Sequence, residues 1–275
     1  MKKAGAFIRG LIIFLVCMLE VYPLFWMLTA SFKQQYEWSE KPAYALNSGF
    51  YWQNYSDAWT RGHMSTYFRN SLITTLISLV FIVIFSSLVG FAVTKMQWKL
   101  REAVAKYFQF GIMIPVAVAL IPLFQIYSRG RLLNTRTCLI LTYIAFGLSL
   151  SIYLVQGYLR SFPDELMEAA VIDGCGIYRL MYYVVVPLMK NAIVTVLVLQ
   201  FFFKWNDLIF SMTFISDSAL KTVQTGLLYF SDEFGAKNWG AIFASVSMSV
   251  FPMLIIYLIL NRKVMEGMTA GAVKG

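Results

Sequence analysis

The sequence predicts an all-α, polytopic membrane protein with six transmembrane helices. Of its 275 residues, 59% are hydrophobic and 13% are charged, and the mean hydropathy is +0.65. This leaves too little polar surface to cover a soluble globule, of which roughly a quarter is charged. Long uncharged runs also separate the charged residues, and about 20 apolar residues cross the hydrocarbon core as a helix. We expect residues 1–275 to form a single domain.

Six charge-poor segments define the expected spans. They are residues 10–32, 70–94, 107–128, 137–159, 187–210 and 238–261. The first is interrupted only by Glu20, and the fifth is the least regular because Lys204 and Asp207 follow its apolar part. In the third span, Pro115 and Pro122 should lie on nearly the same helix face and kink the helix, since each removes a backbone hydrogen bond.

An even number of spans places both termini on one side of the membrane. A small majority of the 23 Lys and Arg residues falls on that side, which favours cytoplasmic termini. Arg129, Arg131 and Arg136 count against this orientation, because it places their short loop outside. The net charge of +9 is expected to meet anionic lipid and not nucleic acid. The expected location is the plasma or inner membrane, with the first helix as an uncleaved anchor.

Groups that carry out catalysis are scarce. The sequence has no G-x-x-x-x-G-K-[ST] phosphate loop and no G-x-S-x-G, and a single histidine excludes H-E-x-x-H. That histidine, His63, is expected in a solvated loop. Cys17, Cys138 and Cys175 show no C-x-x-C spacing, and their odd number disfavours a disulfide framework. We expect no catalytic residue, no metal site and no cofactor bound by this chain, which cannot hydrolyse ATP by itself.

The segment between the fourth and fifth spans predicts a short helix and a sharp bend. Ser161 and Asp164 form a loose capping pattern, and Pro163 suits the first helical turn. Gly174 permits the left-handed turn that ends the helix, and a second helix should run on toward Pro187. The first helix is acidic, whereas helices that lie on anionic lipid usually carry Lys and Arg. A protein partner therefore suits it better than a membrane surface.

The same segment resembles a known motif. It contains Glu168, Ala169, Ala170, Gly174 and Pro187 in the spacing E-A-A-x3-G-x9-V-x-V-P. This is similar to the EAA loop of permease subunits of ATP-binding-cassette importers, E-A-A-x3-G-x9-I-x-L-P, with Val184 and Val186 as conservative departures. The C-terminal Gly-Ala-Val-Lys-Gly and the run Trp-Asn-Asp at 205–207 resemble the maltose-type branch for carbohydrate uptake, so the resemblance extends over the whole chain.

The resemblance implies a binding-protein-dependent sugar importer that works by alternating access. Such a permease pairs with a sister permease subunit, binds two ATPase subunits that use ATP and Mg, and receives sugar from an extracytoplasmic solute-binding protein. The residues that would form the coupling helix and contact the ATPase are Glu168, Ala169, Ala170, Asp173, Gly174 and Pro187. Two alternatives stay open: an ion-driven secondary transporter that acts alone, and a membrane scaffold without transport.

Polar residues within the spans are candidates for a translocation pathway. Glu20 is the only charge in the first span, and it could instead lie against a polar group of a neighbouring helix. Lys204 and Asp207 stand at i and i+3, so we expect an ion pair on one helix face. With Trp205 and Asn206 they would suit a polyhydroxylated solute, and an anchoring role near the outer leaflet is an equal alternative.

Overall fold

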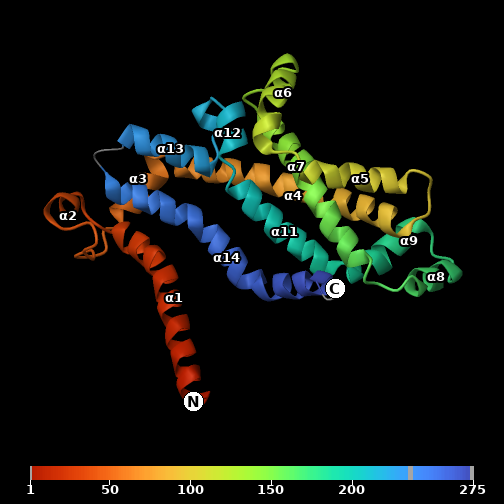
Figure 1. Cartoon of the computed structure of the whole chain (residues 1–275). Coiled ribbons are helices and arrows are strands. Elements are labelled where there is room, and N and C mark those ends of the chain that lie inside the picture. The colour runs from red at the N-terminus through yellow and green to blue at the C-terminus, as the bar shows by residue number, and fades with distance from the viewer. Residues whose placement is uncertain (1, 235–237, 273–275) are drawn as a thin grey trace. The chain divides into compact units, whose positions relative to one another are not determined.

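The computed structural model describes residues 2–234 and 238–272, and the regular elements of this part of the chain are all helical (Figure 1). They are α1 (Lys2–Ala30), α2 (Gln35–Glu40), α3 (Gln53–Thr60), α4 (Met64–Lys95), α5 (Arg101–Ile112), α6 (Val116–Arg129), α7 (Arg136–Leu159), α8 (Glu165–Ile172), α9 (Ile177–Leu180), the π-helical η1 (Met181–Val185), α10 (Val186–Leu188), α11 (Lys190–Trp205), α12 (Ile209–Phe214), the 3-10 turn η2 (Ser218–Leu220), α13 (Val223–Phe234) and α14 (Trp239–Ala272). The last three residues of the Gly-Ala-Val-Lys-Gly tail lie outside the described residues. The all-α prediction is confirmed.

Several of these helices are long and apolar enough to cross a membrane. Four meet this test alone: Phe7–Ala30 of α1, all of α4, all of α7, and Trp239–Leu260 of α14. Two bent combinations, α5 with α6 and α9–α10 with α11, meet it only when their halves are counted together. The described residues therefore hold up to six spans, and each overlaps one of the six predicted segments.

The third span is not a single kinked helix, and this prediction is wrong. α5 and α6 meet at 103° across a short break. Pro115 is the N-cap of α6 and has extended backbone, whereas Pro122 lies inside α6. A proline pushes the residue before it out of the helical region, so the chain breaks at Pro115, and the two prolines do not share a helix face.

The fifth span also differs from its predicted bounds of 187–210. The helical stretch Ile177–Leu188 meets α11 at 72° and includes the five π-helical residues of η1. Pro187 lies in the single turn of α10. α11 ends at Trp205 with Asn206 as its C-cap, so Asp207 lies beyond the helix.

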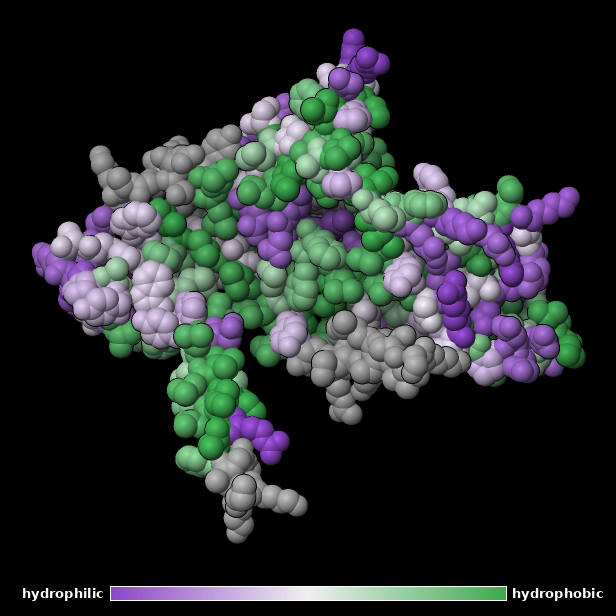
Figure 2. Space-filling view, in the orientation of Figure 1, coloured by the Kyte–Doolittle hydropathy of each residue, from purple (hydrophilic) through white to green (hydrophobic). Residues whose placement is uncertain are grey.

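The chain divides into two compact units. The first combines Met1–Ser65 with Gly226–Pro252. In it, the segment that follows α1 packs on the beginning of α14: the ring of Trp38 stacks on Phe243 with centroids 5.2 Å apart, and Trp26 meets the same ring edge-on at 5.1 Å. α1 itself presents an apolar surface over most of its described length (Figure 2).

The second unit combines Thr66–Thr225 with Met253–Gly275 and contains two apolar clusters. One cluster consists of Ile82, Phe91, Val155, Leu159, Met167, Leu180, Val185, Met189 and Val196, and the other of Tyr127, Cys138, Leu139, Tyr143, Phe210, Phe214 and Ile215. The first cluster fixes α8 and the helices after it to α4 and α7. The second holds the segment that follows α11 against α6 and α7.

Candidate functional site

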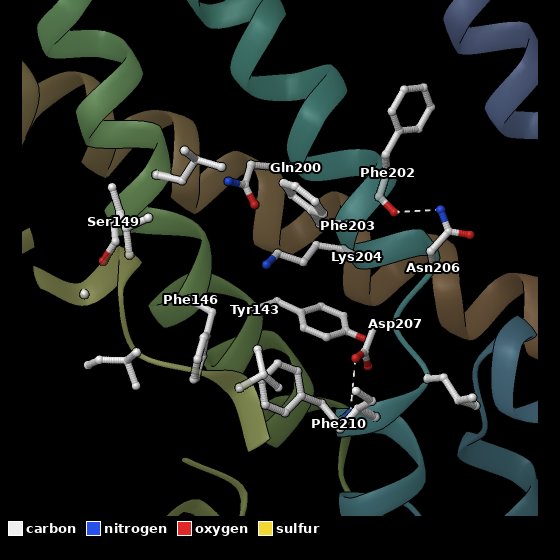
Figure 3. A pocket seen from close by; sticks show the side chains of 17 residues that line it. Tyr143, Phe146, Ser149, Gln200, Phe202, Phe203, Lys204, Asn206, Asp207 and Phe210 are labelled. Atoms are coloured by element: carbon white, nitrogen blue, oxygen red, sulfur yellow. Dashed lines mark hydrogen bonds between the residues drawn. The ribbon is translucent and has the colours of Figure 1, made fainter. Parts of the chain in front are cut away.

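The second unit contains a pocket of about 780 Å³ (Figure 3). Its wall comes from the end of α5, the break before α6, the middle of α7, the end of α11 and the residues that follow α11. The aromatic lining residues are Tyr143, Phe146, Phe202, Phe203 and Phe210, and the polar ones are Ser149, Gln200, Lys204, Asn206 and Asp207. A mostly apolar cavity with a few placed polar groups is typical of a site for a small molecule.

The broken third span contributes backbone to this pocket. Gly111, Ile112, Ile114 and Val116, on both sides of the break, line it. A Cβ atom at Gly111 would lie 2.3 Å from Oγ of Ser149, so a larger residue would require the serine side chain to move. Glycine at this position therefore lets α5 pack closely on α7 beside the pocket.

Lys204 and Asp207 do not form the predicted salt bridge. They are not among the ion pairs of the described residues that have N and O atoms within 4.0 Å. Tyr143 contacts both instead: its hydroxyl donates to Oδ2 of Asp207 at 2.8 Å, and Nζ of Lys204 lies 5.6 Å from the centre of its ring. Because α11 has ended before Asp207, the i, i+3 geometry of a helix does not apply to this pair.

Asp207 has further donors. Its oxygens accept from the backbone N–H groups of Phe210 at 3.1 Å and of Ser211 at 3.0 Å. Both of these residues lie in the first turn of α12, where N–H groups have no partner within the helix. The carboxylate therefore caps α12 as well as binding Tyr143.

Gln200 is a polar side chain in the pocket wall that the sequence analysis missed. It is buried, with 1% of its surface exposed. Its Nε2 donates to the carbonyl of Gly147 and to Oγ of Ser151, both at 3.1 Å, while its Oε1 has no hydrogen-bond partner among the described residues. The available signal was a glutamine inside the apolar run 191–203, because a polar group at membrane depth needs a partner.

The structure brings together two of the four residues predicted for the pathway. Asn206 and Asp207 line the pocket, but Trp205 does not. Trp205 is buried, with its ring stacked on Phe201 at 5.4 Å and edge-on to Phe68 at the same distance. Glu20 is exposed on α1 and does not line the pocket.

The bend predicted at the end of α8 is confirmed, whereas the predicted capping at its beginning is wrong. α8 begins at Glu165, its N-cap Asp164 makes no side-chain capping bond, and Pro163 lies before the helix. The hydroxyl of Ser161 donates to the carbonyl of Tyr158 instead.

α8 ends at Ile172, and Gly174 follows with φ of +81°. The N–H of Cys175 donates to the carbonyl of Ala170, and that of Gly174 to the carbonyl of Val171, both at 3.0 Å. These two bonds form a Schellman motif, whose left-handed position is best filled by glycine.

α8 is held firmly at its beginning. Nζ of Lys95, at the end of α4, lies 2.5 Å from Oδ1 of Asp164 and donates to the carbonyl of Phe162 at 2.8 Å. Met167 packs in the first apolar cluster with Leu159 of α7. α8 is thus attached to two long helices at once.

The rest of α8 and the bend after it are exposed. Apolar Leu166, Val171 and Ile172 are 45%, 59% and 84% exposed, and Glu168 and Asp173 are exposed beside them. Hydrophilic surface gathers around α8 in Figure 2. Large exposed apolar side chains rimmed by acidic ones are typical of a surface that binds another protein.

Comparison with known proteins identifies the family. Residues 82–266, which include the pocket and α8, match the family described as binding-protein-dependent transport system inner membrane component. The chain belongs to this family. As a permease subunit it is a transport component and not an enzyme, and it crosses the membrane several times.

Relatives of this permease cover almost the whole chain. The probable ABC transporter permease protein YurM of Bacillus subtilis is 31% identical over 96% of this chain and 87% of its own. The melibiose/raffinose/stachyose import permease protein MelC of the same species is 31% identical, covering 92% of this chain and 91% of MelC.

A solved structure shows the same fold. It belongs to a bacterial ABC transporter involved in the import of the acidic polysaccharide alginate, with a TM-score of 0.83 and 18% identity. The match covers 94% of this permease and 96% of the solved chain. Membership in this family rules out the ion-driven transporter that acts alone and the scaffold without transport.

Proposed function

We propose that this permease subunit imports a sugar by alternating access. Its relatives include permeases named for melibiose, raffinose and stachyose import and for diacetylchitobiose uptake. The pocket suits such a solute, since aromatic faces cover the apolar side of a sugar ring and amide groups bind its hydroxyls. The single observation that carries the proposal is this pocket in a chain of a binding-protein-dependent transport family.

The proposed assembly contains a sister permease chain, two ATPase subunits and an extracytoplasmic solute-binding protein. A second alginate transporter structure with a TM-score of 0.67 was solved in complex with a periplasmic protein that holds an alginate pentasaccharide, which supports a binding-protein partner. ATP and Mg would be used by the ATPase subunits alone, because this chain has no phosphate loop.

α8 is the proposed contact with the ATPase subunit. The contact residues would be Glu168, Ala169, Ala170, Asp173 and Gly174, with Pro187 closing the motif at the far end of the bend. Two features support this role: the attachment of α8 through Lys95 and Met167, and the exposed apolar and acidic surface that it presents. A rigid helix can pass a displacement of the ATPase to α4 and α7. This arrangement also requires that α8 and both termini face the cytoplasm.

Substitution of Gly174 tests the coupling contact. At φ of +81° a β-branched side chain is strained by roughly 1 kcal/mol or more, so Gly174→Val should turn α8 away from its partner. We expect normal amounts of inserted protein, a weakened hold on the ATPase during co-purification, and uptake that is lost or uncoupled from ATP hydrolysis. Gly176→Val is the matched control, because Gly176 has φ of −67° and both glycines have open space around the missing Cβ.

Glu168→Lys tests the charge of the same surface. The lost contact should leave a donor on the ATPase without a partner, at a cost of about 1–3 kcal/mol. Glu102→Lys, at an exposed site in the first turn of α5, is its control. If Gly174→Val and Glu168→Lys both keep the ATPase as tightly as their controls and transport at the parent rate, the coupling role of α8 is refuted.

A further inference from the structure

Two polar groups in the pocket wall have no hydrogen-bond partner among the described residues, and they stand one helical turn apart on α11. They are Oε1 of Gln200, which is enclosed, and Nζ of Lys204, which faces the ring of Tyr143. Both residues line the pocket, at positions i and i+4. Figure 3 shows both side chains extending from α11 to the same side, with the ring of Tyr143 beside Lys204. One is an acceptor and the other a donor, so they offer complementary halves of one binding site.

The orientation of the Gln200 amide follows from its neighbours. The carbonyl of Gly147 can only accept, so the atom that faces it at 3.1 Å must be Nε2, which donates. Oε1 therefore takes the remaining position, where it is enclosed and has no donor within reach. A buried polar atom without a partner costs free energy, which a bound hydroxyl would recover.

Lys204 also places a buried polar group in the pocket wall. It is 9% exposed, and among the described residues its ammonium group has the ring of Tyr143 as its neighbour but no hydrogen-bond acceptor. The nearest carboxylate, Asp207, directs its oxygens to Tyr143 and to the N–H groups of Phe210 and Ser211. The three donors of this ammonium are thus available to a ligand.

We propose that Gln200 and Lys204 form a subsite for the sugar that this subunit transports. A sugar hydroxyl donates its proton to Oε1 of Gln200, and an oxygen of the same ring accepts from Nζ of Lys204. The aromatic residues of the pocket cover the ring's apolar face. This subsite rests on the proposed import function. Because Oε1 is enclosed in the state described here, the sugar reaches it when the pocket opens during alternating access.

The charges around the subsite select a neutral sugar. Lys204 contributes one positive charge and Asp207 one negative charge to the same pocket wall. These two charges cancel, so a uronate or sulfonate would add an uncompensated negative charge to a low-dielectric cavity. The subsite is therefore assigned to a neutral mono- or oligosaccharide.

Transport by the reconstituted complex in proteoliposomes tests the subsite. The probes are raffinose and maltotriose as neutral sugars and trigalacturonate as an acidic one. The variants are Gln200→Met and Lys204→Met, and the control is Gln156→Met, since Gln156 is a buried glutamine of α7 outside the pocket. We expect the parent to import a neutral sugar, and each variant to import it about ten-fold more slowly, the factor expected for one lost hydrogen bond. Complex yield and ATP hydrolysis should stay at the parent level.

Three outcomes would overturn the subsite. The first is uptake at the parent rate by both variants. The second is a loss of uptake no larger than the loss of assembled complex, which is the behaviour of a substitution that only disturbs folding and for which Gln156→Met is the comparison. Import of trigalacturonate that depends on Lys204 would show an anion site instead. A parent complex that imports no saccharide refutes the import function together with the subsite, whereas an active parent with unaffected variants refutes the subsite alone.

Protection from thiol labelling keeps the subsite testable if either variant misfolds. Asn206 is exposed and lines the pocket, so Asn206→Cys, in a chain whose three native cysteines are alanine, should react with a soluble thiol reagent. The transported neutral sugar should slow this reaction several-fold and leave the labelling of Ser161→Cys unchanged. Equal labelling with and without the sugar would contradict the subsite.

Discussion

Two buried polar clusters of this permease differ in how completely their groups are paired. In the loop after α1, Glu37 is 1% exposed, and its carboxylate accepts from the N–H of Gln34, from the N–H and hydroxyl of Ser48 and from Nζ of Lys41 at 2.7–3.1 Å. In the pocket, Gln200 and Lys204 are almost as buried, yet within the described part of the chain Oε1 of Gln200 has no hydrogen-bond partner and Nζ of Lys204 faces the ring of Tyr143.

The difference separates a structural role from a binding role. A buried carboxylate with four donors ties distant parts of a loop together, and nothing else has to bind it. Buried groups without partners make the protein less stable, and in the proposed subsite a bound sugar would supply the missing bonds. The two clusters should therefore respond in opposite ways to substitution.

The largest effect is expected for Glu37→Ala. The N–H and the hydroxyl of Ser48 and the N–H of Gln34 would lose their acceptor, at a local cost of about 3 kcal/mol. The backbone amides of residues 33–52 should then exchange hydrogen much faster at neutral pH, as measured by mass spectrometry. Glu40→Ala, at an exposed position in the same helix, should leave the exchange unchanged. Equal protection in the two variants would contradict the structural role of Glu37.

A smaller effect is expected from pH. Burial raises the pKa of Glu37, but hydrogen bonds from Ser48, Gln34 and Lys41 outweigh it and lower the pKa to about 2. Because the folded pKa lies below the ordinary value of 4.5, the stabilisation is complete above about pH 4.5 and is lost as the pH falls toward 2. The difference in thermal midpoint between the parent and Glu37→Gln should be constant from pH 7 to 5 and shrink toward pH 3. A difference that does not change with pH would show that the charge is unimportant.

The smallest effect, and of opposite sign, is expected for Lys204→Met. Removing this buried ammonium should leave the free energy of unfolding of the purified protein unchanged or raise it by about 1 kcal/mol at most. The thermal midpoint should accordingly stay the same or rise slightly. Asp207 keeps its bonds to Tyr143 and α12 in this variant. A clear loss of stability would mean that Lys204 is a structural residue like Glu37, which removes the contrast between the two clusters.

The parts of the fold that depend on local signals could be predicted from the sequence. Charge-poor segments predicted the helices that are long and apolar enough to cross a membrane, because a charge at the centre of a span costs a few kcal/mol. Gly174 located the bend after α8, because left-handed backbone strains other residues. Both signals act within a few residues and need no knowledge of neighbouring helices.

The parts that depend on tertiary structure could not be predicted. The sequence of the third span is compatible with a kinked helix as well as with the 103° break at Pro115, and the close approach at Gly111 helps to decide between them. Lys204 and Asp207 have the spacing of an ion pair, but Tyr143, some 60 residues away, contacts both. Gln200 carries no charge, so the pattern of charged residues in the spans does not reveal it.

The break between α5 and α6 places irregular backbone beside the pocket. It lies inside the uncharged run 107–128, and the helix ends on either side leave backbone N–H and C=O groups without helical partners. Lipid tails offer no hydrogen bonds, so irregular backbone persists within a membrane only beside a hydrated cavity or under protein cover. Gly111, Ile112, Ile114 and Val116 border the pocket at this point. If α5 and α6 form one span, water in the pocket or cover by another subunit has to satisfy these groups.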